Sequence, residues 1–443
     1  MVAESQMANI YQRPAELLQR LIQFDTTNPP GNETECIAYI ETLLQKAGFE
    51  TTRLAKDPNR PNLITRLKGR GAAPPLLLYG HVDVVTTNGH KWTHPPFAGK
   101  AVDGFIWGRG ALDMKSGIAM MLSAVMRAGM DNLIPAGDIV LAMLCDEEAG
   151  SDYGAKYLVE NHPDQFSKIR YAISEFGGFT NHIGPKRFYP IQIAEKQICW
   201  MKATVHGPGG HGARRVRGGA MSKLAELLRQ LDKRRLPVHI TPVARQMIEI
   251  TTANLTFPKN LILRRLLNPA LTDTLLDLLG EMGESLDPLL HNTVNATIVR
   301  GGDKINVVPG EVSVEMDGRL LPGFAPEDMI NEVRQVIGDQ VELEILRYEP
   351  GPAEPDMGLF GELAGILRDA DPGTIPTPLL MPAISDARIF SKLGIQTYGF
   401  TPMKLPPGFA FFKTIHAADE RIPADAVSFG ADAIYELLKR YSG

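Results

Sequence analysis

Three consecutive acidic residues, Asp146, Glu147 and Glu148, follow the apolar run 139–145. An apolar run of this length with polar residues after it predicts a buried strand, and open α/β sheets bind their ligands where such strands end. Carboxylates this close repel one another, and burial raises their pKa values further, unless a cation offsets both effects. The acidic triplet therefore predicts a metal site.

A second apolar run, 75–79, leads directly into His81 and Asp83. Side chains alternate along a strand with period two, so these two residues share one face. Metal-binding histidines commonly donate their second ring N–H to a nearby carboxylate, which fixes the tautomer and the orientation of the ring. We therefore expect the carboxylate of Asp83 to orient His81.

Three further segments carry residues of metal-binding type. Asp113 ends a glycine-rich turn before a helix predicted over 118–130, Glu175 ends the short strand 171–175, and His416 lies far along the chain. Each residue alone is more often a cap, a turn former or a surface residue than a ligand. With His81 and one carboxylate of the acidic triplet they make a mixed nitrogen and oxygen set of five ligands. That is too many for one tetrahedral zinc and fits two metals sharing a carboxylate.

These segments resemble the motifs of the zinc-dependent M20 metallopeptidases and aminoacylases, a family that includes acetylornithine deacetylase and succinyl-diaminopimelate desuccinylase. The matching motifs occur in the family's order and span nearly the whole chain: GHVDVV at 80–85, GRGALDMKSG at 108–117, DEE at 146–148, SEFGG at 174–178, GGHG at 209–212, NVVP at 306–309 and His416. The stretch 25–33 also resembles the family's N-terminal signature.

The resemblance implies a role for each matching residue. Five of them would bind two Zn²⁺ ions per subunit: His81 and Glu175 one ion, Glu148 and His416 the other, with Asp113 bridging both. Asp83 would orient His81, and Glu147 would be the general base. A nitrogen and oxygen ligand set would also accept Co²⁺ or Mn²⁺. The implied reaction is hydrolysis of an amide bond in an N-acyl amino acid or a short peptide.

The resemblance also implies residues that bind or stabilise the substrate. The family histidine that matches His211 stabilises the oxyanion, often from the partner subunit, whereas a lone histidine in a glycine-rich turn is equally often an exposed loop residue. Asn306 and Arg319 match positions that contact the substrate carboxylate. Ser385 and Arg388 match a loop on the substrate side, although Arg388 could equally be a surface ion-pair partner.

Two details depart from the family pattern. Ser174 stands where many relatives carry a second acid. After the GGHG motif come Arg214, Arg215 and Arg217, where relatives usually have a small residue and a proline. These arginines could favour an acidic substrate, but such a run is more often a solvated face.

The pattern of predicted elements changes at Cys199. The expected order there is β-α-β-β-α-β, the ferredoxin-like unit, with elements over 199–206, 221–233, 295–300, 311–319, 326–338 and 341–348. Residues 234–294 lengthen the first connection, and the leucine-rich stretch 261–279 predicts one or two extra helices within it. Helices predicted over 360–370 and 424–441 return to the first domain.

These elements predict an α/β fold with two domains. A zinc-aminopeptidase-like catalytic domain, with a mixed central sheet flanked by helices, would comprise residues 1–198 and 351–443. An inserted ferredoxin-like α+β lid would comprise residues 199–350. The resemblance implies that the lid mediates formation of a homodimer.

Composition limits the partners that we expect. The net charge of −5 shows no electrostatic footprint for nucleic acid or for a polybasic membrane anchor, so the partners should be small molecules. Cys36, Cys145 and Cys199 form no CxxC zinc signature, and two of them lie in apolar contexts that suit buried thiols. A reducing cytoplasm fits this cysteine usage best. The first residues lack the pattern of a signal peptide, and no run of 18 apolar residues occurs.

Other classes of enzyme lack their signatures in this sequence. No G-x-S-x-G nucleophile elbow and no HExxH zinc motif occurs, and Asp113 stands where a GxGxxG motif needs its third glycine. One alternative is an amidohydrolase of ureido or carbamoyl amino acids with the same two-metal centre. The other is a non-catalytic binding protein, which predicts loss of the base or a ligand, whereas Glu147 and all five ligands are present.

Overall fold

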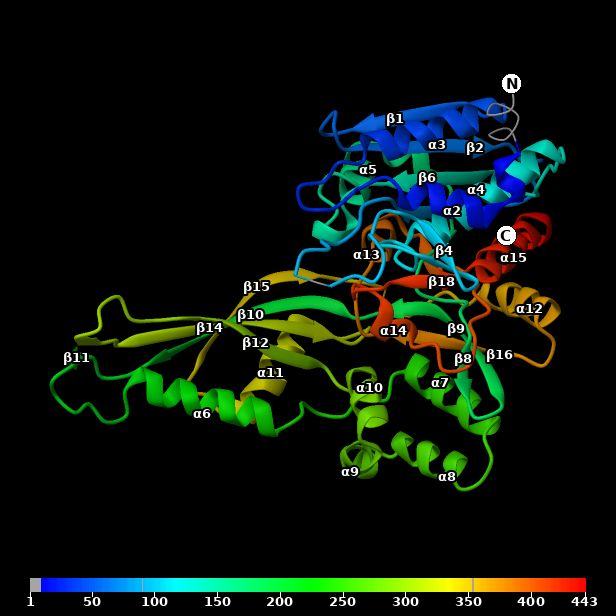
Figure 1. Ribbon diagram of the computed structural model, residues 1–443. Helices are drawn as coiled ribbons and strands as arrows, with labels where there is room; N and C mark the ends of the chain where they lie inside the picture. The colour runs from blue at the N-terminus through cyan, green and yellow to red at the C-terminus, as the bar shows by residue number, and fades with distance from the viewer. Residues whose placement is uncertain (1–8, 90, 353) are drawn as a thin grey trace. The chain divides into compact units, whose positions relative to one another are not determined.

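The computed structural model describes residues 9–89, 91–352 and 354–443, and the chain forms two compact units (Figure 1). Unit 1 comprises Met1–Ile193, Asp356–Leu379 and Ser385–Gly443, and unit 2 comprises Ala194–Pro355 and Leu380–Ile384. The main segment of unit 2 thus begins before and ends after the predicted lid range 199–350. Unit 2 also includes the separate short segment Leu380–Ile384. The first eight residues, where we expect no targeting segment, lie outside the described part of the chain.

Unit 1 is built on a mixed nine-stranded sheet. Its strands, in chain order, are β1 (Thr51–Ala55), β2 (Pro61–Leu67), β3 (Leu76–His81), β6 (Ile139–Leu144), β7 (Tyr171–Ser174), β8 (Asn181–Ile183), β9 (Lys186–Glu195), β16 (Ile375–Met381) and β17 (Gln396–Gly399). The order across the sheet is β1-β2-β6-β3-β7-β17-β9-β16, with β8 on β9. The central strands β6, β3, β7 and β17 are parallel. Their carboxyl ends therefore meet at one edge of the sheet.

Helices cover both faces of this sheet. They are α2 (Pro14–Ile22), α3 (Thr34–Lys46), α4 (Lys115–Met130), α5 (Ala155–Asn161), α12 (Phe360–Ala370), α13 (Ala387–Phe390), α14 (Phe411–Thr414) and α15 (Ala424–Arg440). On one face Leu77 and Tyr79 of β3 pack with Leu158 of α5 and Phe390 of α13. On the other face α4 lies against β3, with α2 and α15 packed on it.

The close approach of α4 to β3 depends on Gly80. A Cβ atom at this position would lie 2.6 Å from the Cε of Met114, just before α4 begins. The helix itself is buried on nearly every side, as its almost continuous apolar sequence predicts. A smaller sheet of β4 (Lys100–Val102), β5 (Phe105–Trp107) and β18 (Arg421–Pro423) completes unit 1.

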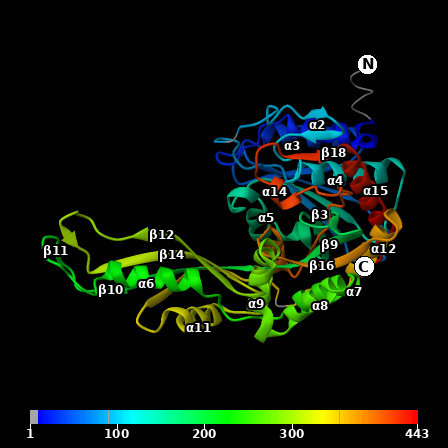
Figure 2. The same cartoon turned by 60° about the horizontal axis from the view of Figure 1, so that its bottom comes forward.

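Unit 2 contains a four-stranded antiparallel sheet in the order β12-β14-β10-β15. Its elements, in chain order, are β10 (Gln197–His206), α6 (Ala220–Lys233), β12 (Thr293–Arg300), β14 (Glu311–Leu320), α11 (Pro326–Ile337) and β15 (Glu342–Glu349). This is the β-α-β-β-α-β order expected from the sequence. Along β14 alternate residues, including Val312, Val314 and Met316, are buried in the core that the sheet forms with α6 and α11. Both helices lie on the same side of this sheet (Figure 2).

Two additions distinguish unit 2 from a minimal unit of this kind. A two-stranded ribbon is formed by β11 (Gly210–His211) and β13 (Val307–Val308). The first connection carries α7 (Pro242–Ala253), α8 (Lys259–Arg264), α9 (Pro269–Leu279) and α10 (Glu281–Leu290), which share a small core of their own. The leucine-rich stretch 261–279 contains α9 and most of α8, as predicted, whereas α7 and α10 on either side were not predicted. Pro288 lies inside α10, and an interior proline normally indicates a helix end.

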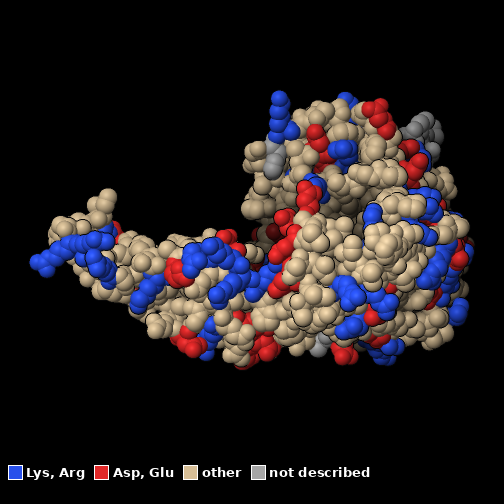
Figure 3. Space-filling model, turned by 90° about the horizontal axis from the view of Figure 1, so that it is seen from below, with Lys and Arg blue, Asp and Glu red and all other residues tan. Residues whose placement is uncertain are grey.

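Other sequence expectations concern thiols and charge. Cys36, Cys145 and Cys199 are all buried and free. Among the described residues, no helix combines the length and the apolar character needed to cross a bilayer. Both signs of charge are interspersed over the face shown in Figure 3, where Lys and Arg gather toward one end of unit 2. Arg214, Arg215 and Arg217 are exposed side chains.

Candidate metal centre

Residues with metal-binding side chains meet at the carboxyl edge of the parallel strands in unit 1. His81 is the last residue of β3, the acidic triplet follows β6, and Glu175 follows β7. Because β3 lies between β6 and β7, these three strand ends are neighbours. The edge is also the general ligand-binding position of open α/β sheets.

The donor atoms form two clusters that share Asp113. In the first cluster, Nε2 of His81 lies 3.1 Å from Oδ1 of Asp113 and 3.3 Å from Oε2 of Glu175. In the second cluster, Nε2 of His416 lies 3.2 Å from Oδ2 of Asp113 and 3.2 Å from Oε1 of Glu148. Within each cluster all candidate donor atoms lie within 4.8 Å of one another. Asp113 thus offers one carboxylate oxygen to each side.

A glycine-rich turn presents Asp113 from between β5 and α4. Gly110 has φ of +85°, which side chains rarely adopt, and a Cβ there would lie 3.0 Å from atoms of Lys115 and Val84. The buried Nζ of Lys115, at the start of α4, donates to the carbonyl oxygens of Leu21 and Phe24. The turn is therefore packed tightly on both sides, which limits the positions open to the carboxylate.

The three acids of the triplet have different surroundings. Asp146 has φ of +69° and turns its carboxylate away from both clusters, where it accepts from Arg60 at 2.9 Å and from Asn28 at 3.0 Å. Glu147 and Glu148 then occupy a short 3-10 turn. Their backbone N–H groups donate to the two carboxylate oxygens of Asp83, at 3.2 and 3.1 Å. One acid is neutralised by an arginine, one joins the second cluster, and Glu147 stands beside both clusters.

Two oxygen atoms of Asp83 lie near the imidazole of His81. Nδ1 of His81 lies 3.0 Å from the backbone carbonyl oxygen of Asp83 but 3.6 Å from its carboxylate, which is beyond hydrogen-bond distance. The chain turns after His81, so the carbonyl faces the ring while the carboxylate is engaged by the amides of the acidic turn. Asp83 therefore faces the imidazole with its backbone carbonyl oxygen and, at ion-pair distance, with its carboxylate, and its role in orienting His81 stays a prediction.

The pKa values of several groups in the two clusters are raised, because these groups lie close to one another in a largely buried site. Burial, followed by the charge of Asp113, raises the pKa of Glu175 to about 8. Burial and the nearby Glu175 raise the pKa of Glu147 well above its usual range. Hydrogen bonds to Asp113 and Glu148 raise the pKa of His416 to about 10. Negative charges that share one buried site thus disfavour one another's ionisation.

This donor set fits a pair of divalent cations. It consists only of imidazole nitrogen and carboxylate oxygen, which zinc, cobalt and manganese all accept. Each of His81, Asp113 and Glu175 is less than 7% exposed, and buried charges of this kind are normally paired or bind a metal. The second cluster is more open, because the His416 side chain is 49% exposed. A substrate could therefore approach from that side.

One buried acid near Glu147 had no assigned role in the sequence. Asp386 is 2% exposed, accepts a hydrogen bond from Oγ of Ser151 at 2.5 Å and contributes to the raised pKa of Glu147 through its charge. It lies within the SDAR segment whose first and last residues we expected to bind substrate. Ser385 and Arg388 are both buried, and Arg388 donates to the carbonyl oxygen of Ser385 at 2.5 Å.

Unit 2 brings together two of its three candidate residues. Both His211 and Asn306 are exposed, and the β11–β13 ribbon joins their segments, with Gly212 N donating to the carbonyl oxygen of Asn306 at 2.8 Å. Arg319 lies at the other end of β14, opposite Ile198, and makes a two-point ion pair with Asp317 at 2.7 and 3.0 Å. Arg319 is therefore remote from the ribbon within this unit.

The residues that form hydrogen bonds and ion pairs with Asp83 and Asp146 were not identified from the sequence. Asn28 donates to Asp83 at 2.8 Å as well as to Asp146, and Arg60 pairs with both Asp146 and Glu33. Asn28 and Glu33 lie in the stretch 25–33, whose likeness to a family signature was the only available signal. Arg60 lies outside every motif.

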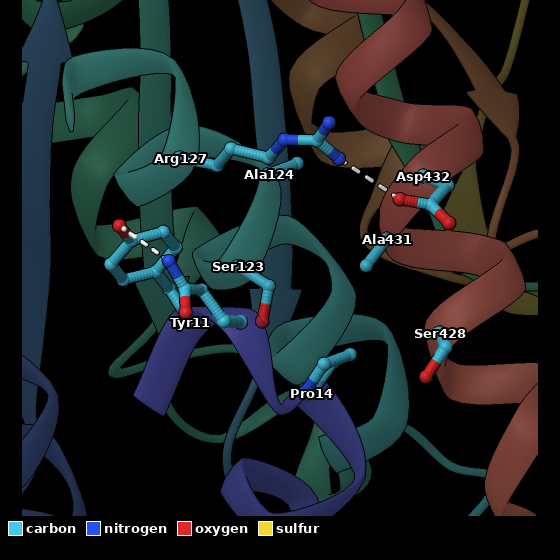
Figure 4. Close-up of a pocket in the computed structure, with 9 residues that line it drawn as sticks. Tyr11, Pro14, Ser123, Ala124, Arg127, Ser428, Ala431 and Asp432 are labelled. Carbon is cyan, nitrogen blue, oxygen red and sulfur yellow. Dashed lines mark hydrogen bonds and ion pairs between the residues drawn. The ribbon is translucent and has the colours of Figure 1, made fainter. Parts of the chain in front are cut away.

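A separate cavity of about 280 Å³ lies in unit 1 between the N-terminal residues, α4 and α15. Figure 4 shows Tyr11 and Pro14 on one side of it, Ser123 on α4, and the ion pair between Arg127 and Asp432, whose atoms are 3.0 Å apart. None of its lining residues belongs to the two clusters. The Oγ atom of Ser123 is buried and has no hydrogen-bond partner among the described residues.

Comparisons with known proteins cover nearly the whole chain. Residues 77–440 match Peptidase family M20/M25/M40. The sequence is 28% identical over 383 residues to the probable carboxypeptidase S-like 2 of Dictyostelium discoideum, covering 82% of this chain and 71% of that protein. It is 24% identical over 440 residues to aminoacylase-1 of Sus scrofa, covering 95% and 93% of the two chains.

Solved structures share the fold. The M20 family metallo-carboxypeptidase Sso-CP2 from Sulfolobus solfataricus superposes with a TM-score of 0.69 at 18% identity, covering 97% of this chain and 99% of that one. The YXEP protein of Bacillus subtilis, described as a dinuclear metal binding peptidase, superposes with a TM-score of 0.61 at 13% identity, covering 97% of each chain.

Proposed function

Since the chain belongs to Peptidase family M20/M25/M40 and is a metal-dependent hydrolase of amide bonds, we propose that it cleaves N-acyl amino acids or short peptides at a two-metal centre. The observation that supports this most directly is the pair of donor clusters sharing Asp113 beside Glu147. The names of the similar proteins, a carboxypeptidase and an aminoacylase, agree on the bond and differ on the substrate.

The proposed ligands divide between the clusters. His81 and Glu175 would hold one zinc ion, Glu148 and His416 the other, and Asp113 both. When bound, the metals supply Lewis-acid chemistry, lowering the pKa of water from 15.7 to about 7 and stabilising negative charge on a carbonyl oxygen. Co²⁺ or Mn²⁺ would suit the same donors.

We assign Glu147 the role of general base. Its neighbour Glu148 is engaged with His416, whereas the Glu147 side chain makes no ion pair among the described contacts and keeps a raised pKa. A carboxylate in this position can take a proton from the attacking water and return it to the departing amine. Asp83 assists by holding the backbone of both glutamates, so the two side chains leave the turn in fixed directions.

The remaining candidate residues would bind the substrate or stabilise the oxyanion that forms from it. His211 would donate to the oxyanion, and Asn306, next to it on the ribbon, would contact the substrate. Arg319 would bind a carboxylate, and this would require it to share its guanidinium with Asp317. Ser385 and Arg388 are buried, which makes support of the site through Asp386 the better assignment for them. We also propose a homodimer formed through unit 2.

The test is release of free amine from a panel of N-acyl amino acids, dipeptides and ureido acids by zinc-loaded protein. Glu147→Gln is the blank, because it keeps the shape of the side chain and removes the base. Turnover of one class above the blank supports the proposal and identifies the substrate class. Turnover of ureido acids alone would favour the carbamoyl alternative, and no turnover despite two bound metals would contradict the catalytic assignment.

A further inference from the structure

A fully buried ion pair in unit 1 has no place in the donor clusters. Arg109 and Glu420 are each 0% exposed, and Nη1 of Arg109 lies 2.5 Å from Oε2 of Glu420. Removing two charges from water is costly, so a buried pair is weak evidence that stability is its purpose. The position of the pair in the chain indicates another purpose, because Arg109 precedes Asp113 and Glu420 follows His416 in their respective loops.

Glu420 holds the turn that presents Asp113. Its Oε1 atom accepts hydrogen bonds from the backbone N–H groups of Leu112 at 2.7 Å and Asp113 at 3.2 Å. Its backbone carbonyl oxygen accepts from Gly108 N at 2.9 Å. A single residue of the C-terminal loop thus contacts both ends of the 108–113 turn, including the residue shared by the two clusters.

Arg109 holds the loop that presents His416. Its Nη2 atom donates to the carbonyl oxygen of His416 at 3.2 Å, and the guanidinium carbon lies 5.2 Å from the ring centre of Trp92. His416 has φ of +60°, a left-handed conformation that non-glycine residues rarely adopt and that needs support from its surroundings. The guanidinium supplies that support at the carbonyl of the same residue.

We propose that Arg109 and Glu420 are positioning residues that join the loops of Asp113 and His416 and thereby set the metal affinity of the second cluster. Neither side chain belongs to a donor cluster, so both act through the residues they hold. The first cluster depends on β3 and β7 for two of its donors, whereas the second needs two loops to meet at a fixed spacing. This inference rests on the proposed two-metal function and concerns only one of its two sites.

The test compares Glu420→Gln with wild type by zinc titration against a chromophoric chelator, starting from metal-free protein. Gln keeps the size of the side chain and an oxygen for the amides of Leu112 and Asp113, but it removes the charge that holds Arg109. We expect the zinc ion of the second cluster, identified as the one that Glu148→Ala loses, to be bound about 10–100-fold less tightly, as for other residues that orient ligands, with the other zinc ion changed less than about threefold. High zinc concentrations should restore kcat.

Asp371→Asn is the matched control. Asp371 is also a buried carboxylate that pairs with an arginine, Arg187 at 2.8 Å, but it lies outside the site. Its substitution should lower the melting temperature and leave both zinc affinities unchanged. If Glu420→Gln does not fold, Arg109→Lys carries the test, since lysine keeps the charge but cannot reach Glu420 and His416 together.

Three results would overturn the inference. Unchanged zinc affinities in folded Glu420→Gln would remove the positioning role. An equal loss at both sites would show that the pair maintains the domain as a whole. Wild type that binds only one zinc would contradict the proposed two-metal function itself, and the inference would fall with it.

Discussion

The carboxylate of Asp83 accepts a hydrogen bond from the backbone N–H of Glu147 at 3.2 Å. Its second oxygen accepts from the next backbone N–H at 3.1 Å. The side chain therefore supports the acidic turn after β6, while the imidazole of His81 is contacted by the carbonyl oxygen of Asp83. One residue thus connects the end of β3 to the turn that carries the proposed base.

Asp83→Asn should reduce kcat while leaving the protein folded. The new amide group presents a donor where an acceptor is needed, so the backbone of the acidic turn must shift and Glu147 with it. We expect a loss of roughly 10–100-fold in activity, measured by steady-state kinetics at saturating zinc. Asp57→Asn is the control, because Asp57 also accepts from a backbone N–H, that of Asn59, but in an exposed turn. Equal effects would remove the proposed link.

Glu147→Gln should abolish most of the turnover and keep both metals. A positioned general base contributes roughly 10²–10⁴-fold to rate, and this substitution removes the base without removing a proposed ligand. Metal content by elemental analysis and kcat on the best substrate provide the measurement. Glu160→Gln, at an exposed position on α5, should change neither quantity. Loss of metal together with activity would reassign Glu147 as a ligand.

Asp113→Ala should lose more metal than Glu148→Ala. Asp113 offers one oxygen to each cluster, whereas Glu148 belongs only to the cluster with His416. We expect Glu148→Ala to retain close to one zinc per chain and Asp113→Ala to retain less. Zinc stoichiometry after dialysis against a weak chelator distinguishes the two. Identical stoichiometry in both variants would show that the carboxylate is not shared.

Metal loading at pH 7 should release protons, and metal-free protein should become less stable as pH rises. The pKa of Glu175 is raised to about 8 and that of His416 to about 10, so both are protonated at pH 7 and must lose a proton to bind metal. Raised pKa values in the folded state favour folding below the unfolded values, and this contribution disappears as pH rises through 8 and then 10.

Calorimetric titration of zinc in buffers with different ionisation enthalpies measures the protons released. Melting temperatures between pH 6 and pH 10, with and without zinc, measure the stability. We expect the melting temperature to decrease with pH only in the metal-free protein, because the loaded donors are already deprotonated. A flat profile without metal would mean that these groups are not held protonated.

Lys196 should give unit 2 the opposite dependence on pH. Burial, followed by the charge of Arg319, lowers its pKa to about 7, and its Nζ donates to the carbonyl oxygen of His291 and to Thr293. Between this value and the unfolded value of about 10.4 the unfolded chain binds more protons, so stability rises with pH. Urea unfolding of Lys196→Met across pH 7–10 should lack the rise, and an unchanged slope would contradict the lowered pKa.

The metal donors could be found in the sequence because each ends a clear local pattern. An apolar run followed by His81, by the acidic triplet or by Glu175 predicts a side chain at a strand end, and parallel strands bring such ends together. The β-α-β-β-α-β order of unit 2 could be predicted for a similar reason. Residues of β14 and β15 alternate between more buried and less buried positions along the strand.

Relationships between distant segments could not be found in this way. Arg109 and Glu420 are 311 positions apart, and the sequence around each gives no indication that the two side chains pair. The acceptor beside His81 depends on how the chain turns after the strand, which no periodicity specifies. The two-point pairing of Arg319 with Asp317 was equally hidden, because neighbouring charges on a strand face can pair with each other or with a ligand.

The positions of the donors along the chain mean that the two clusters become complete at different stages of protein synthesis. The ribosome makes all three donors of the first cluster, His81, Asp113 and Glu175, before any residue of unit 2. The second cluster waits for His416, which is translated only after the whole of unit 2. A nascent chain therefore contains a complete set of donors for one metal long before it contains the donors for the second, which is complete only after unit 2 has been made.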